Sequence, residues 1–228
     1  WWNAAWSERT ALHLPTSTPG LVRANYPDGI NPATIRVVTA GGKTPLPHWS
    51  QRITMSEPRR VAEDPKLHYG FPRMVRAADG RVVLFYRVGT QHAADHSFIA
   101  VRDSRDDGRT WSAERRVWQD VEGTSAHNPV ALVTPSGRIL LWISRYVYAN
   151  PPGKERQSCL WCWSDDHGDS WSTPTRFDPS DERRCYYITE AIVTGDGLLA
   201  ADASFPPDAT TCYAQAWHSA DGGATWQV

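Results

Sequence analysis

An eight-residue pattern occurs three times in the C-terminal part of this chain. The copies are Ser104–Trp111, Ser164–Trp171 and Ser219–Trp226, and all of them obey Ser-x-Asp-x-Gly-x-(Thr/Ser)-Trp. Their first residues lie 60 and 55 positions apart, a period typical of a four-stranded antiparallel blade with its loops. The repeat therefore predicts an all-β chain folded as a β-propeller.

The residue types in this pattern suit a tight turn. The side-chain oxygens of Asp106, Asp166 and Asp221 can accept hydrogen bonds from backbone N–H groups, and a glycine two positions later permits positive φ. The closing tryptophan can pack the turn against the hairpin beneath it. Because each aspartate is committed to its own turn, we expect these three residues to be structural and not catalytic.

A second turn signal precedes each copy of the pattern. The dipeptides Asp79-Gly80, Ser136-Gly137 and Asp196-Gly197 stand 25, 28 and 23 positions before the pattern begins. Short apolar runs flank both turns. The predicted strands are 71–75, 82–86, 98–101 and 115–118 in the first blade, 129–133, 139–143, 159–163 and 174–177 in the second, and 191–193, 198–201 and 213–217 in the third.

The first 63 residues differ from the rest, because they lack the pattern and carry many turn formers. We expect a β-rich N-terminal segment at 1–63 and a partial propeller of about three blades at 64–228. Closed propellers have four to eight blades. The ring can be completed by blades beyond Val228, by unusual strands in 1–63, or by self-association of two copies, and we favour the first of these, a chain that is a fragment.

Composition limits the kinds of partner. The net charge of −1 argues against nucleic acid as a partner, and no apolar run is long enough for a membrane span. The chain starts at Trp1 and not at methionine, which fits removal of a leader, and we expect a secreted or extracellular protein. Cys159 and Cys162 have the spacing of a redox or zinc pair but fall in one predicted strand, where they would point to opposite faces. We expect no metal and no cofactor.

Several of these residues resemble the sialidase (neuraminidase) superfamily of propeller glycoside hydrolases. The likeness covers about 68–228 and rests on the three turns, on Phe71-Pro-Arg-Met-Val75 and on the Asp-Gly turn that follows it. It implies six blades in the complete protein and cleavage of a terminal acidic sugar, such as sialic acid, from glycans. Sialidases depart from two-carboxylate hydrolysis by using a tyrosine nucleophile.

The resemblance assigns roles residue by residue. Arg73 matches the first arginine that holds the substrate carboxylate, and Arg87 resembles a further arginine of the pocket. Asp95 occupies the place of the acid/base aspartate, and Glu190 that of the glutamate that polarises the nucleophile. The chain departs from the family at 203–205, where Ala-Ser-Phe stands in place of the second carboxylate-binding arginine.

Spacing alone supports two of these residues. Counting back seven positions from each turn glycine gives Arg73, Val130 and Glu190, the same point on the innermost strand of each blade. A buried, unpaired charge there would be costly, so each charge must meet a partner, water or a ligand. An ion pair between Arg73 and Glu190 across the channel is the structural alternative to a ligand site.

Two other functions are open. His68, His92, His96, His127 and one of Tyr186 and Tyr187 fall at expected channel-mouth positions, where a neutral imidazole or a tyrosine could take the proton next to a uronate carboxylate while Arg73 stabilises the charge. That arrangement is similar to some propeller polysaccharide lyases, which act by β-elimination. Tyr187 is therefore a catalytic candidate, and His127 and Asn128 are candidate substrate-binding residues. A non-catalytic glycan-binding propeller is the third possibility.

Overall fold

The structure, a computed structural model, describes residues 58–92, 96–119, 124–147, 157–177, 185–205 and 213–228. The chain divides into two compact units, Trp1–Pro58 and Arg59–Val228. Nearly all of the first unit lies outside the described residues. The β-rich segment expected at 1–63 therefore stays a prediction.

Every regular element in the described part of the chain is a strand, so the all-β expectation is confirmed. Each of the predicted strands overlaps an observed one. The strands are β1 (His68–Arg76), β2 (Val82–Gly89), β3 (Ser97–Ser104), β4 (Arg115–Gln119), β5 (Thr124–Val133), β6 (Ile139–Val147), β7 (Gln157–Ser164), β8 (Thr175–Arg176), β9 (Cys185–Val193), β10 (Leu198–Phe205) and β11 (Tyr213–Ser219).

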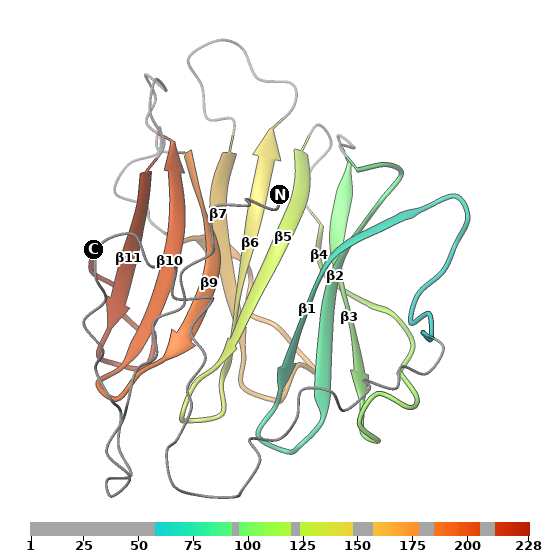
Figure 1. Cartoon of the computed structure of the whole chain (residues 1–228), viewed down its shortest axis with the longest axis horizontal. Helices are drawn as coiled ribbons and strands as arrows, with labels where there is room; N and C mark the ends of the chain where they lie inside the picture. Colours follow the sequence, from blue (N-terminus) through green and yellow to red (C-terminus); the bar gives the residue numbers. More distant parts are fainter. Residues whose placement is uncertain (1–57, 93–95, 120–123, 148–156, 178–184, 206–212) are drawn as a thin grey trace, which may run out of the picture. The chain divides into compact units, whose positions relative to one another are not determined.

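The strands form three antiparallel blades. The first blade pairs β1–β2–β3–β4, the second pairs β5–β6–β7–β8, and a single parallel pairing of Ser97 with Ser125 joins them. The third blade pairs β9–β10–β11, and Gln227 bridges back to His218. Figure 1 shows the three blades side by side, coloured from green through yellow to red. The first strands of the blades meet, since β5 contacts both β1 and β9.

The eight-residue turns close as the sequence predicts. In the second blade Asp166 Oδ1 accepts hydrogen bonds from Ser170 N and Ser164 Oγ, at 2.8 and 2.7 Å, and Gly168 N donates to Ser164 Oγ. The same bonds recur around Asp106 and Asp221. All three aspartates use both carboxylate oxygens inside their own turns.

The closing tryptophans also contact the preceding blade, which the sequence did not predict. Each ring lies near its own turn, but Trp171 of the second blade also packs edge-on against Phe85 of β2 in the first, with ring centroids 5.4 Å apart. Trp226 of the third blade meets Trp142 of β6 in the same way, at 5.6 Å. The pattern therefore fastens each blade to the preceding one, in addition to closing a hairpin.

Apolar side chains fill the spaces between blades. One cluster, which includes Phe85 and Leu141, lies between the first and second blades, and another, which includes Trp142 and Ile188, lies between the second and third. Cys159 belongs to the second cluster and Cys162 to the first, both as buried free thiols. They point to opposite faces of β7, as predicted. No helix in the described ranges is long and apolar enough to cross a lipid bilayer.

Candidate functional site at the inner strands

The first strands of the three blades enclose a hollow. Its volume is about 340 Å³, and β1, β5 and β9 each contribute three consecutive residues to its lining. The lining residues are Phe71, Pro72 and Arg73, then Asn128, Pro129 and Val130, then Tyr187, Ile188 and Thr189. Segments that are about 57 residues apart in the sequence therefore build one concave surface, as the repeat implied.

A β-bulge interrupts each inner strand at the hollow. In β1 the pairing with β2 shifts between Gly70 and Arg73, in β5 it shifts around Asn128, and in β9 it shifts around Thr189. Bulges bend a strand and re-aim its side chains, and they are frequent beside functional sites. The sequence carries a signal for two of them, because Pro72 and Pro129 stand inside strands and proline is tolerated there only at an edge or a bulge.

Two bulge residues have left-handed backbone conformations. Phe71 has φ 54° and Asn128 has φ 28°. Such conformations cost about 1–3 kcal/mol for non-glycine residues and gather at functional sites, where the surrounding fold enforces them. Phe71 is bulky, which makes its conformation the less common of the two.

Arg73 and Glu190 do not form the ion pair that was the structural alternative to a ligand site. Both side chains are exposed, and the structure gives no salt bridge between these two described residues. Arg73 lines the hollow, whereas Glu190 is not part of the lining and its Oε1 accepts a hydrogen bond from Ala191 N at 3.1 Å. The expected cost of burial does not arise, because both charges remain in contact with solvent.

The bulge at Thr189 brings Tyr187 and Glu190 to the same face of β9. Ile188 pairs with Asp202 and Glu190 with Ala201, so Thr189 is an extra residue that reverses the alternation of side chains. Burial agrees with this assignment, since Ile188 and Ala191 are both core residues. No hydrogen bond joins Tyr187 to Glu190 in the described part of the chain, but Tyr187 lines the hollow.

Arg87 and His127 lie deep beside the hollow. Arg87 lies fully buried near the end of β2, and its Nη1 donates to the backbone oxygen of Gln91 at 2.9 Å. His127 is also buried, and burial, aided by the positive charge of Arg87, lowers the pKa of its imidazole to about 4. At neutral pH His127 is therefore uncharged.

Aromatic and imidazole rings surround Phe71. Its ring centroid lies 5.5 Å from that of His92 and 5.7 Å from that of His127, and His92 in turn meets His68 at 5.5 Å. The ring of Tyr146 in β6 packs edge-on against His127, with ring centroids 4.7 Å apart, a neighbour that sequence spacing did not indicate. Three of the four histidines expected at the channel mouth are thus together, while His96 is exposed before β3.

Some expected site residues fall outside this description. Asp95 lies outside the described residues, as does the side chain of Tyr186. Within the described ranges, no group of three or more His, Cys, Asp or Glu residues is arranged to hold a metal ion.

Comparisons with known proteins agree with this architecture. Residues 33–127 match the model of a BNR repeat-like domain. A sialidase from Paraclostridium sordellii is 24% identical over 185 residues, which are 71% of this chain and 46% of that protein. The chain therefore spans about half the length of this relative.

Solved structures of sialidases have a similar fold. The Hadza microbial sialidase Hz136 superposes with a TM-score of 0.61 at 22% identity, over 69% of this chain and 36% of that one. A Trypanosoma rangeli sialidase in complex with sialic acid gives a TM-score of 0.58 at 17% identity, over 70% and 30% of the two chains. The fold is that of a sialidase-type β-propeller. Together with the family match, these findings support the assignment of the chain to the sialidase/BNR-repeat superfamily.

Proposed function

We propose that this chain provides one side of the active site of a sialidase-like glycoside hydrolase that releases a terminal acidic sugar from glycans. The observation that carries the proposal is the hollow at the inner strands, which contains an exposed arginine, Arg73, without a carboxylate partner among the described residues. A guanidinium in such a position can bind a carboxylate in a bidentate manner.

The volume and lining of the hollow suit a single sugar ring. About 340 Å³ lies at the lower end of the range for small-molecule sites. Pro72, Val130 and Ile188 supply apolar contacts, and Asn128, Tyr187 and Thr189 supply polar ones. This mixture fits a ligand with an apolar ring face and several hydroxyl groups.

The catalytic roles in the proposal follow from position. Asp95, which precedes β3 in the sequence, would protonate the leaving oxygen, and Tyr187 would attack the anomeric carbon with Glu190 as the base that polarises its hydroxyl. The shared face of Tyr187 and Glu190 supports this pairing. Arg87 would add positive charge behind the bound carboxylate, and neutral His127 would help to form the wall of the site.

Hydrolysis of fluorogenic glycosides tests the proposal. We expect leaving-group release from a sialic acid glycoside and none from the matching galactoside, with release abolished in Asp95→Ala. Asp107→Ala is the matched control, because Asp107 is an exposed aspartate that pairs only with Arg76 among the described residues. A protein that cleaves no acidic glycoside contradicts the proposal.

The histidine cluster favours a second candidate, a lyase that cleaves uronate-containing glycans by β-elimination. His92, which contacts Phe71, and His68, which contacts His92, have no role in the proposed hydrolysis, and a neutral imidazole or tyrosine can accept the proton that elimination removes. With its pKa near 4, His127 is a weak base, which leaves Tyr187 or His92 for that step. New absorbance from an unsaturated uronate would identify this activity, whereas saturable glycan binding without turnover would identify a binding propeller. The protein would be secreted in each case.

A further inference from the structure

We propose that the Oδ1 atom of Asn128 accepts a hydrogen bond from one O–H or N–H group on the ring of the bound acidic sugar, so that Asn128 selects among acidic sugars by that substituent. The inference rests on the proposed function of the hollow. In addition to the carboxylate, the site would recognise a hydrogen-bond donor on the sugar ring.

The first observation is an unsatisfied polar atom. Asn128 Oδ1 is buried and has no hydrogen-bond partner among the described residues. A buried amide oxygen without a donor costs folding free energy, which a ligand donor would restore on binding. Asn128 also belongs to the lining of the hollow, where such a ligand would lie.

The second observation is that nearby protein groups are poor donors to this oxygen. Pro72 and Pro129 line the hollow beside Asn128 and have no backbone N–H. The hydroxyl of Thr189 donates to the backbone oxygen of Ala201 at 3.1 Å. Among the described residues, neither the two prolines nor the Thr189 hydroxyl donates a hydrogen bond to Asn128 Oδ1.

The third observation is the backbone at the bulge. Asn128 is the extra residue of β5 and has φ 28°, a conformation that asparagine tolerates better than most residues. Asn128 has no pairing partner in β6, and the residue belongs to the lining of the hollow. The neighbouring bulge residue, Phe71, adds an aromatic surface that can contact an apolar part of the same ligand.

Binding of several ligand analogues to wild type and to variants of Asn128 tests the inference. Calorimetry would compare N-acetylneuraminic acid with analogues in which hydrogen replaces one hydroxyl group or the acetamido group. We expect one analogue to bind wild type about tenfold more weakly than the parent, the loss of one hydrogen bond. Asn128→Ala should bind the parent about tenfold more weakly and no longer distinguish it from that analogue.

Two further variants separate recognition from backbone effects. Asn128→Gly accepts positive φ without strain, so its loss of discrimination should equal that of Asn128→Ala. Asn128→Asp keeps an acceptor oxygen and should still discriminate, although its charge weakens binding of every anionic ligand. Uniform weakening of all ligands in Asn128→Ala, or lost discrimination in Asn128→Asp, overturns the inference and leaves the proposed function intact. Failure of wild type to bind any of the acidic sugars would overturn both.

Discussion

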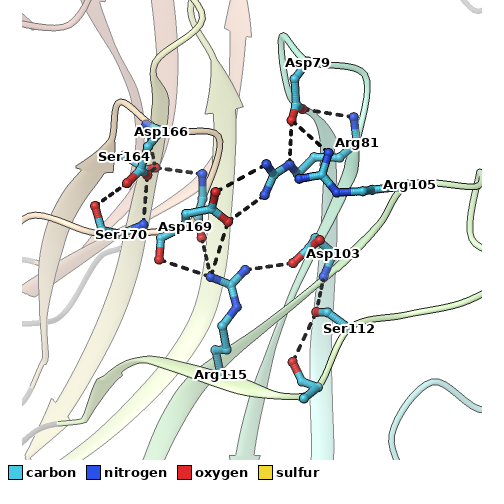
Figure 2. Close-up of polar contacts among 12 residues, drawn as sticks. Asp79, Arg81, Asp103, Arg105, Ser112, Arg115, Ser164, Asp166, Asp169 and Ser170 are labelled. Atoms are coloured by element: carbon cyan, nitrogen blue, oxygen red, sulfur yellow. Dashed lines mark hydrogen bonds and ion pairs between the residues drawn. The ribbon is translucent and has the colours of Figure 1, made fainter.

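Arg81 and Asp169 join the first blade to the second, although 88 residues separate them. Arg81 is 5% exposed, and its Nη1 donates to Asp169 Oδ1 at 2.7 Å, while its Nε donates to Asp79 Oδ2 in its own hairpin. Arg115 reinforces the contact by donating to the backbone oxygens of Gly168 and Asp169 (Figure 2). The eight-residue turn of one blade is thus held by charged groups of the blade before it.

The next pair of blades lacks this contact. Ala224 occupies the position of Asp169 in the third blade, and Arg138, which corresponds to Arg81, pairs instead with Asp165 of its own blade. Between the described parts of the second and third blades, Trp142, Phe177 and Trp226 pack edge to face.

We predict that Asp169→Ala lowers the free energy of unfolding by about 1–2 kcal/mol, because it leaves the buried Arg81 with one carboxylate instead of two. Asp165→Ala is the matched control. Its partner Arg138 is 39% exposed, so the loss should stay below about 1 kcal/mol. Urea unfolding of the two variants measures their free energies of unfolding. Equal losses would show that the contact between blades contributes no more to stability than the exposed pair does.

The aspartates of the turns should make stability depend on acid. Hydrogen bonds from Ser170 and Ser164 lower the pKa of Asp166 to about 2. A carboxyl group with a depressed folded-state pKa stabilises the fold above its unfolded pKa of about 4 and loses that contribution as pH falls toward 2. We predict that the difference in melting temperature between wild type and Asp166→Asn is constant from pH 7 to 5 and shrinks below pH 4. A difference that does not change with pH would refute this origin.

Glycine is required in the turn of the third blade for two reasons. Gly223 has φ 98°, and a Cβ there would lie 2.8 Å from Leu140 Cδ1 of the second blade. We predict that Gly223→Ala lowers the free energy of unfolding by about 1–3 kcal/mol. Gly80→Ala shares the positive φ but has open space around it, and Gly195→Ala has neither constraint. The losses measured by urea unfolding should decrease in that order, and any other order contradicts the explanation.

His127 should titrate far below an ordinary histidine. Burial and the charge of Arg87 hold its pKa near 4, so its ring signals in NMR spectra should shift around pH 4 and not around pH 6.5. Because the folded-state pKa is depressed, the unfolded chain binds the extra proton first, and the contribution of neutral His127 to stability is present above pH 6.5 and declines as pH falls toward 4. Titration near pH 6.5 would show that the side chain is not buried beside Arg87.

What the sequence could predict depended on the range of the interactions involved. The turn around Asp166 is made by residues within the same eight positions, so its bonds follow from residue types alone. Inner strands could be aligned by counting back from Gly80, Gly137 and Gly197, because each of these glycines follows the end of its inner strand by four positions. Of the three residues that this alignment matched, Arg73 and Val130 line the hollow and Glu190 does not.

The side-chain directions at the site could not be obtained in this way. A bulge shifts the alternation by one residue, so the face on which Glu190 lies depends on the pairing of β9 with β10 and not on spacing. Pro72 and Pro129 signalled two of the bulges, but nothing in the local sequence marks Thr189. The Arg81 to Asp169 contact likewise depends on how two blades pack, which no local pattern encodes.

The central claim is that the inner strands of these blades bind an acidic sugar through Arg73. Calorimetry of N-acetylneuraminic acid binding to wild type, Arg73→Ala and Arg76→Ala tests it most directly, since Arg76 is exposed on the same strand and pairs with Asp107. We predict that Arg73→Ala weakens binding by about 10- to 100-fold, the loss of a charge-assisted hydrogen-bond pair, while Arg76→Ala binds as wild type does. Equal affinities for wild type and Arg73→Ala would contradict the account.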